Sequence, residues 1–232
     1  MMKKIKLLCL PYAGASATIY YKFQPLLEEN INLIPIELSG RGIRIDEPLL
    51  FSFEEAIEDV VYQIQANIKP EDEYMILGYS FGSLLGYEAS KRLKKKPLHL
   101  FLAAFQPPMY KVSSADTLKL EDKEFVQKLV DSGGIEASIA DNMDLLKYFI
   151  PIIRADFTSI EDYEFREPCK KLDCNATVLY TLEDEHSDKI HKWNNIFEYP
   201  CEYEEFTGNH FFIKREYNRI ANIINRVSVR YI

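Results

Sequence analysis

A strand, a helix and a second strand between residues 74 and 104 restrict the fold of this chain more than any other feature. Apolar runs cover residues 74–79 and 98–104, and the segment between them, residues 81–93, has a helical pattern. Short runs that are apolar throughout are typical of strands buried on both faces, and a helix between two such runs indicates a parallel crossover. The sequence therefore predicts an α/β fold in which helices flank a mostly parallel central sheet.

The same alternation of strands and helices extends in both directions along the chain. Pro35 in the second strand pattern suggests an edge strand or a strand start, and Ser52 with Glu55 forms a capping box that opens a helix. With 232 residues and 47% hydrophobic side chains, the chain is long enough for one well-filled domain, so we expect a single domain over residues 1–232. The other strands are expected at residues 5–10, 32–38, 176–181 and 201–206, and the other helices at residues 17–29, 53–66, 188–197 and the C-terminal segment.

Between about residues 110 and 167 the alternation breaks off. Helical patterns near residues 121–132 and 144–156 are separated by Gly133-Gly134, and a turn-rich piece follows them. The segment comes after a strand whose carboxyl end should face the active site, so we expect a helical lid insertion over residues 110–167. The alternative is a helical pair that covers a sheet edge and has only a structural role.

Composition argues against several classes of function. The formal net charge of -8 disfavours sequence-independent binding of nucleic acid, which depends on a basic surface. No apolar stretch approaches the ~18 residues that span a bilayer, and the apolar run near the N-terminus is too short for a signal peptide. Four scattered cysteines lack the spacing of a zinc site or a disulfide scaffold. We therefore expect a cytoplasmic protein with free thiols, no metal, and no nucleic-acid or membrane partner.

Ser80 lies between two glycines in Gly78-Tyr79-Ser80-Phe81-Gly82, at the turn from the predicted strand into the predicted helix. This is the pattern of a nucleophile elbow, in which the glycines leave room for a strained turn that exposes the serine hydroxyl above the sheet. Alone, the pattern also fits an ordinary turn, because short glycine and serine motifs occur by chance.

Two further loops with suitable chemistry follow predicted strands. Asp184 follows the strand at residues 176–181, and His210 follows the strand at residues 201–206. Because ligands bind at the carboxyl ends of parallel strands, these loops can converge with the loop of Ser80. The chain order Ser80, Asp184, His210 is characteristic of α/β-hydrolases. We expect Ser80 to be the nucleophile, His210 to accept its proton, and Asp184 to hold the tautomer of His210 and stabilise the imidazolium.

Other residues compete for the roles of base and acid. His210 is preferred because it lies in a glycine-led loop after the final strand, and Asp184 is preferred with its neighbours as solvated loop charges. The competing histidines are His99, His186 and His191, and the competing acids are Glu183, Glu185 and Asp188.

Acyl transfer also needs two amide donors for the oxyanion. The elbow supplies one from Phe81, at a helix N-terminus where the helix dipole favours negative charge. The second should come from the loop after the first strand, where Ala13 is the candidate and Tyr12 the fallback.

Markers of one enzyme family occur in order along nearly the whole chain. They are Leu10-Pro11-Tyr12-Ala13-Gly14, Gly40-Arg41-Gly42-Ile43-Arg44 with Glu47-Pro48, the elbow at Ser80, Arg154-Ala155-Asp156 with Glu161-Asp162-Tyr163, Trp193, and Gly208-Asn209-His210-Phe211-Phe212. Together they resemble the type II thioesterases of nonribosomal peptide and polyketide assembly lines. The resemblance implies an α/β-hydrolase fold with a helical lid, and hydrolysis of acyl or aminoacyl thioesters on the phosphopantetheine arm of carrier proteins.

The resemblance also implies roles for particular residues. Ser80 would be the nucleophile, Asp184 the acid and His210 the base, and the amides of Ala13 and Phe81 would form the oxyanion hole. Beside the nucleophile the chain departs from the family pattern, because Tyr79 and Phe81 stand where the family usually has His and Met. We expect these bulkier residues to affect the shape of the acyl pocket, and Tyr12 and Tyr79 are candidates for substrate contact.

The expected function is thioester hydrolysis through an acyl-Ser80 intermediate, by a monomer that needs no cofactor. Its partners would be acyl or peptidyl carrier proteins, which Arg41, Arg44 and Arg154 could contact near the mouth of the site. Two alternatives stay open: a carboxylesterase acting on small-molecule esters, and a catalytically silent module that uses the same fold to bind a carrier protein.

Overall fold

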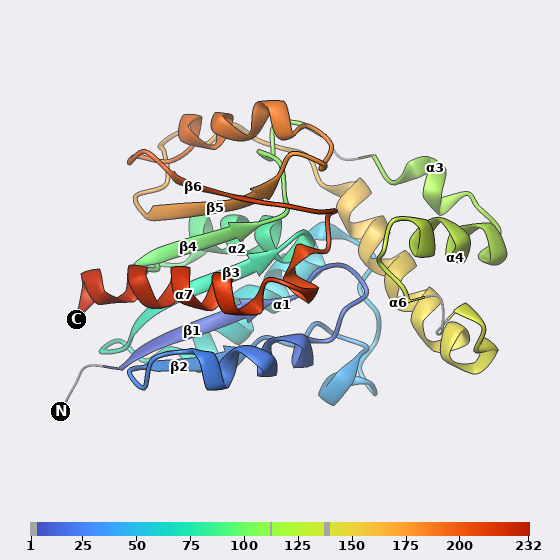
Figure 1. The fold of residues 1–232 in the computed structure, drawn as a ribbon, viewed down its shortest axis with the longest axis horizontal. Coiled ribbons are helices and arrows are strands. Elements are labelled where there is room, and N and C mark those ends of the chain that lie inside the picture. The colour runs from blue at the N-terminus through green and yellow to red at the C-terminus, as the bar shows by residue number, and fades with distance from the viewer. Residues whose placement is uncertain (1–3, 112, 137–139) are drawn as a thin grey trace.

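The computed structural model of the protein describes residues 4–111, 113–136 and 140–232. Its six strands form one sheet in the order β2-β1-β3-β4-β5-β6, and every neighbouring pair is parallel (Figure 1). The strands are β1 (Ile5–Leu10), β2 (Ile31–Pro35), β3 (Glu73–Tyr79), β4 (His99–Ala103), β5 (Asn175–Thr181) and β6 (Glu202–Phe206). The predicted α/β fold is therefore confirmed.

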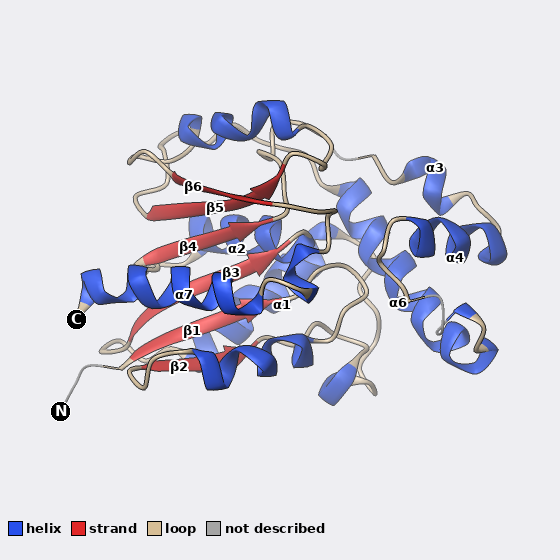
Figure 2. Ribbon diagram, in the orientation of Figure 1, coloured by secondary structure: helices blue, strands red, loops and turns tan. Residues whose placement is uncertain are grey.

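The two faces of the sheet are covered by different helices (Figure 2). One core contains buried side chains of α1 (Phe53–Asn67), α2 (Phe81–Arg92) and the 3-10 helix η3 (Ser187–Asn195), and the other contains those of the 3-10 helix η1 (Ala17–Leu26) and α7 (Tyr217–Ser228). Side chains alternate between these cores along each strand. In β3, Ile76 belongs to the first core, whereas Leu77 and Tyr79 belong to the second.

The segment after β1 differs from its predicted helix. It forms the 3-10 helix η1, which starts at Ala17 after Ser16, whose hydroxyl accepts a hydrogen bond from the amide of Thr18. The helix ends at Leu26, three residues before the predicted end, and its last turn contains Pro25, which has no amide hydrogen. The following strand, β2, lies at the edge of the sheet as Pro35 suggested.

Three described helices lie between β4 and β5, and we call them the inserted helices: α3 (Ala115–Leu118), α4 (Asp122–Asp131) and α6 (Met143–Asp162). Figure 1 shows them beyond the end of the sheet toward which the strand arrows point. The helix α6 runs past its predicted end at residue 156 because Ile160 is buried and the carboxylate of Asp162 accepts a hydrogen bond of 3.0 Å from the amide of Phe53.

Three short 3-10 helices complete the described structure: η2 (Gly42–Arg44), η4 (Phe212–Lys214) and η5 (Val229–Tyr231). Among the residues that the structure describes, no helix is both long and apolar enough to cross a lipid bilayer.

Candidate active site

Ser80 occupies a tight turn between β3 and α2. Its backbone has φ 52° and ψ -117°, a conformation that L-residues rarely adopt and that costs about 1–3 kcal/mol. The two glycines make the turn possible. A Cβ atom at Gly78 would lie 2.3 Å from the carbonyl oxygen of Gly82, and one at Gly82 would lie 2.1 Å from the carbonyl oxygen of Leu10. The local geometry is that of a nucleophile elbow.

The structure brings Ser80, His210 and Asp184 together. His210 Nε2 lies 2.9 Å from Ser80 Oγ, and His210 Nδ1 lies 2.9 Å from Asp184 Oδ1. A carboxylate can only accept, so Nδ1 carries the proton and Nε2 is free to accept the proton of the serine hydroxyl. The side chain of His210 is 34% exposed, which leaves it accessible to water.

The loops that carry the acid and the histidine are tied to each other. Thr181, the last residue of β5, donates a hydrogen bond of 2.6 Å from its hydroxyl to the carbonyl oxygen of Gly208. Asp184 follows Thr181 by three residues, and His210 follows Gly208 by two. The contact between two neighbouring strand ends therefore helps to set the distance between Asp184 and His210.

Tyr79 does not line the cavity at Ser80, contrary to the expectation that it contacts substrate. Its side chain is fully buried on the face of the sheet that α7 covers, because side chains alternate along β3. The phenol donates a hydrogen bond of 2.6 Å to the carbonyl oxygen of His210 and accepts one of 3.1 Å from the amide of Ile213. Burial raises the pKa of the phenol, so it stays protonated. Tyr79 thus holds the loop of His210.

The side chain of Phe81 also points away from the cavity, into the core between the sheet and α1, where it packs against Phe53. Its amide is at the first position of α2 and so has no acceptor within the helix. Among the hydrogen bonds of the described residues, none has the amide of Phe81 or Ala13 as its donor. Both amides are therefore free to bind an oxyanion.

A cavity of about 540 Å³ opens next to Ser80 and His210. The loop after β1, including Tyr12 and Ala13, forms one wall. Burial raises the pKa of Tyr12 to about 12, so its phenol is a permanent donor at neutral pH. Apolar side chains of and around the inserted helices form the other walls: Leu129, Ile135, Phe149, Ile153, Phe157 and Ile160. The cavity suits an apolar acyl group.

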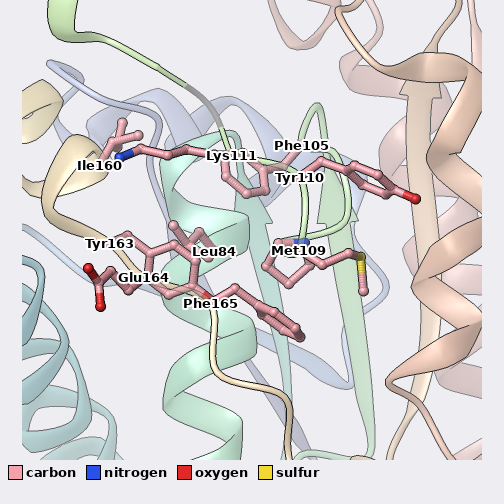
Figure 3. Close-up of a pocket in the computed structure, with 10 residues that line it drawn as sticks. Leu84, Phe105, Met109, Tyr110, Lys111, Ile160, Tyr163, Glu164 and Phe165 are labelled. Carbon is pink, nitrogen blue, oxygen red and sulfur yellow. The ribbon is translucent and has the colours of Figure 1, made fainter.

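A second pocket, of about 420 Å³, shares the lining residues Phe105 and Ile160 with the cavity at Ser80. Figure 3 shows Phe105 together with Leu84 and Met109 in its apolar wall, and Lys111 and Glu164 are among its charged residues. Phe105 also lines a smaller pocket beside Asp184 and His210. The indole nitrogen of Trp193 donates a hydrogen bond of 3.2 Å to the carbonyl oxygen of Phe105. Phe105 therefore lines three pockets, two of which also contain His210.

The three arginines expected near the mouth are engaged within the fold. Arg41 pairs with Asp156, Arg44 pairs with Asp59 and Glu47, and Arg154 donates to the carbonyl oxygens of Leu118 and Leu120 and to Asp122.

The other histidines lie apart from Ser80. His99 is buried beside Thr177, His186 lies near Tyr110, and His191 contacts Tyr203. In the described part of the chain, no group of three or more His, Cys, Asp or Glu side chains is arranged to hold a metal ion.

Two residues near the site, Phe105 and Asp156, have no role predicted from the sequence. A signal exists for Asp156, because it lies at helical spacing among buried residues of α6 that include Ile152, Ile153 and Ile160. A carboxylate in an apolar stripe needs a buried partner. Nothing in the local pattern marks Phe105, whose importance arises from the separate pockets that it lines.

The Thioesterase domain family matches residues 5–228 of the chain. The chain is 26% identical over 216 residues to the gramicidin S biosynthesis protein GrsT of Aneurinibacillus migulanus. This match covers 90% of this chain and 83% of GrsT. It is 26% identical over 217 residues to the medium-chain S-acyl fatty acid synthase thioesterase of Homo sapiens, over 90% of this chain and 80% of that enzyme. Among solved structures, ClbQ from the colibactin NRPS/PKS pathway matches with a TM-score of 0.89 and 28% identity, over 97% of this chain and 96% of ClbQ. The chain therefore belongs to the thioesterase domain family, and the predicted resemblance to type II thioesterases is confirmed.

Proposed function

We propose that this thioesterase releases acyl or aminoacyl groups from the phosphopantetheine arm of acyl or peptidyl carrier proteins, through an ester formed on Ser80. One observation carries the proposal: the hydrogen-bonded set of Ser80, His210 and Asp184 opens into a cavity with apolar walls. The relatives support the choice of partner. GrsT is named for gramicidin S biosynthesis and ClbQ for an NRPS/PKS pathway, and such pathways hold their intermediates on carrier proteins.

The first half of the reaction forms the acyl-enzyme. His210 Nε2 takes the proton from Ser80 Oγ while the oxygen attacks the thioester carbonyl carbon. The negative charge that develops on the carbonyl oxygen is stabilised by the amides of Ala13 and Phe81. The tetrahedral intermediate then collapses, the carbon–sulfur bond breaks, and His210 gives its proton to the pantetheine thiolate.

The second half regenerates the enzyme. Water attacks the Ser80 ester as His210 accepts one of its protons, and the same two amides stabilise the second oxyanion. Collapse releases the carboxylic acid and returns the proton to Ser80. Asp184 keeps the proton on Nδ1 and stabilises the imidazolium in both halves. Every proton is carried by a residue of the chain, so the proposed reaction uses no cofactor.

We also propose that the inserted helices act as a lid over the acyl group. Their apolar side chains form much of the cavity wall, and the segment that follows α4 contacts the loop of His210. One such contact is made by Lys214, four residues after His210, whose ammonium donates hydrogen bonds of 2.8 Å and 3.3 Å to the carbonyl oxygens of Gly133 and Gly134. Closure of a lid would keep water from the acyl chain while the ester forms.

The test compares two substrates and one variant. The same acyl group is supplied as a thioester on a carrier protein and as a small-molecule ester, and hydrolysis of each is measured with the wild type and with Ser80→Ala. We expect a higher kcat/KM for the carrier-bound thioester, and a loss of several orders of magnitude, roughly 10³–10⁶-fold, in the variant. Preference for the free ester would support a carboxylesterase, and absence of any turnover would support a silent binding module.

A further inference from the structure

Asp156 is an almost fully buried carboxylate on the inserted helix α6, with 4% of its surface exposed. It accepts three hydrogen bonds. The amide of Gly14 donates to Oδ2 over 2.6 Å, and the guanidinium of Arg41 donates to Oδ2 over 2.5 Å and to Oδ1 over 2.7 Å. Three distant segments, the loop after β1, the loop after β2 and α6, therefore meet at one carboxylate.

Arg41 serves this contact alone. Its residue surface is 3% exposed, and among the described residues its guanidinium makes no hydrogen bond other than the two to Asp156, while its Nε has no partner. A buried guanidinium is stable only beside an opposite charge. Arg41 therefore supplies the opposite charge for Asp156 and fixes the orientation of the carboxylate that Gly14 contacts.

The bond to Gly14 reaches the loop that holds a proposed oxyanion donor. Gly14 follows Ala13 directly, and its φ of 81° lies in the left-handed region. A Cβ atom at Gly14 would lie 2.4 Å from Cγ1 of Ile153, which is one helical turn before Asp156 on α6. The loop is thus pressed against α6 by packing and tied to it by a charge-assisted hydrogen bond.

The opposite end of the same loop is held from the body of the protein. The hydroxyl of Ser16 donates to Glu37 over 2.6 Å, and the amide of Ala17 donates to the same carboxylate over 2.9 Å. Glu37 belongs to the segment after β2 and does not come from an inserted helix. Of the two carboxylates that hold the loop, Asp156 is therefore the one that depends on the placement of α6.

We infer that Asp156 is a positioning residue for the oxyanion hole, with Arg41 as its counterion. By holding the Gly14 N–H, the carboxylate fixes the peptide group between Ala13 and Gly14. The Ala13 N–H belongs to the preceding peptide group, which is joined to this one at the Cα atom of Ala13, so its direction depends on the same anchor. The inference rests on the proposed function of the site at Ser80. It adds that α6 must be seated for the oxyanion donor to be in place, so the lid segment takes part in arranging the catalytic centre.

The test uses Asp156→Asn and the double variant Asp156→Asn/Arg41→Gln. The first keeps a neutral acceptor for Gly14 but leaves the charge of Arg41 unpaired, and the second removes that unpaired charge as well. The control is Asp59→Asn, which breaks a less buried bidentate pair with Arg44, at 2.7 Å and 2.8 Å, that does not touch the loop after β1. Folding of each protein is checked by circular dichroism and thermal unfolding.

Two kinetic readouts separate positioning from a purely structural role. With an acyl N-acetylcysteamine thioester, we expect kcat to fall roughly 10–100-fold in the Asp156 variants while KM changes little, a loss smaller than that for removal of a whole oxyanion donor. Inhibition by an alkyl trifluoromethyl ketone, whose adduct with Ser80 places an oxyanion in the hole, should weaken in parallel with kcat/KM. The Asp59 control should match the wild type in both readouts.

The outcomes also distinguish this inference from the proposed function. If the wild type hydrolyses the thioester and Ser80→Ala does not, while a folded Asp156 variant keeps wild-type kcat and inhibitor affinity, the positioning role is wrong and the function stands. If the wild type itself hydrolyses no thioester, the proposed function fails first. If Asp156→Asn does not fold, the same two readouts, kcat and inhibitor affinity, are measured on the double variant, and wild-type values in both would show that the positioning role is wrong.

Discussion

The phenol of Tyr79 donates a hydrogen bond of 2.6 Å to the carbonyl oxygen of His210, while the next residue, Ser80, contacts the imidazole of His210 with its hydroxyl over 2.9 Å. Two consecutive residues at the end of β3 thus contact the same histidine: Tyr79 binds its backbone carbonyl, and Ser80 binds its imidazole ring. The first proton transfer therefore depends on a contact inside the core as well as on the elbow.

Replacement of Tyr79 by Phe should weaken the histidine loop without changing the acyl cavity. The amide of Ile213 and the carbonyl of His210 would lose a buried partner, and we expect the free energy of unfolding to fall by about 1–3 kcal/mol. We expect kcat to fall several-fold, with the same ratio of activities on short and long acyl chains. Denaturant unfolding and kinetics on two chain lengths check this, with the exposed Tyr62→Phe as control. A changed chain-length preference at wild-type stability would refute the prediction.

Replacement of Phe105 by Ala should join the cavity at Ser80 to the pocket of Figure 3. A longer acyl chain would then find additional apolar surface, at about 0.8 kcal/mol for each methylene that becomes buried. We expect kcat/KM to shift toward long-chain thioesters relative to short ones. The control is Met109→Ala, because Met109 lines the pocket of Figure 3 and does not line the cavity at Ser80. Equal changes at every chain length would show that Phe105 is not a partition.

Alanine substitutions at Gly82 and at Gly86 should have very different effects, although both residues are in α2. A Cβ atom at Gly82 would lie 2.1 Å from the backbone oxygen of Leu10, which cannot move without disturbing β1. At Gly86 the nearest atom is the side-chain Cγ2 of Ile76 at 3.2 Å, and alanine favours the helix by about 1 kcal/mol. We expect Gly82→Ala to lose activity and soluble yield, and Gly86→Ala to stay near wild type in both. Full activity of Gly82→Ala would contradict the elbow geometry.

His99 should make the protein less stable at acidic pH. Burial lowers its pKa from the ordinary 6.5 to about 4, and its neighbours include Thr177, Tyr231, Glu202 and Arg230. Above pH 6.5 the imidazole is neutral in both states and contributes nothing. As the pH falls toward 4, only the unfolded state binds the proton, so the free energy of unfolding drops by up to about 3 kcal/mol.

The variant His99→Gln isolates this effect from the titration of carboxylates. Its free energy of unfolding, measured by urea denaturation between pH 7.5 and 4.5, should fall less than that of the wild type. An equal fall in the two proteins would mean that His99 is protonated in the folded state.

The sheet and the meeting of Ser80, Asp184 and His210 could be predicted because each depends on local sequence. Apolar runs of strand length mark the buried strands that precede Ser80 and Asp184, whereas His210 follows the edge strand β6, whose sequence is Glu-Tyr-Glu-Glu-Phe. Parallel strands bring their carboxyl ends to the same edge whatever the loops contain. The chemistry of the site therefore follows from strand order and residue type.

Contacts between distant segments could not be predicted in the same way. Arg41 and Asp156 are 115 positions apart, and although the apolar stripe around Asp156 indicates a buried partner, nothing in the sequence identifies that partner as Arg41. Contacts of this kind engage Arg41, Arg44 and Arg154 inside the fold, and their contact with a carrier protein stays a prediction. Tyr79 lies away from the cavity for a simpler reason: closeness to Ser80 in sequence does not bring its side chain to the site, because neighbours on a strand point to opposite faces.

The most direct test of the account is the mass of the enzyme during turnover. Wild-type protein mixed with an excess of acyl thioester and quenched in acid should carry one acyl group, and fragmentation should place it on Ser80. The Ser80→Ala variant should carry none and should release no acid above the uncatalysed rate. An acyl group on another residue, or continued hydrolysis by Ser80→Ala, would contradict the central claim that Ser80 is the nucleophile.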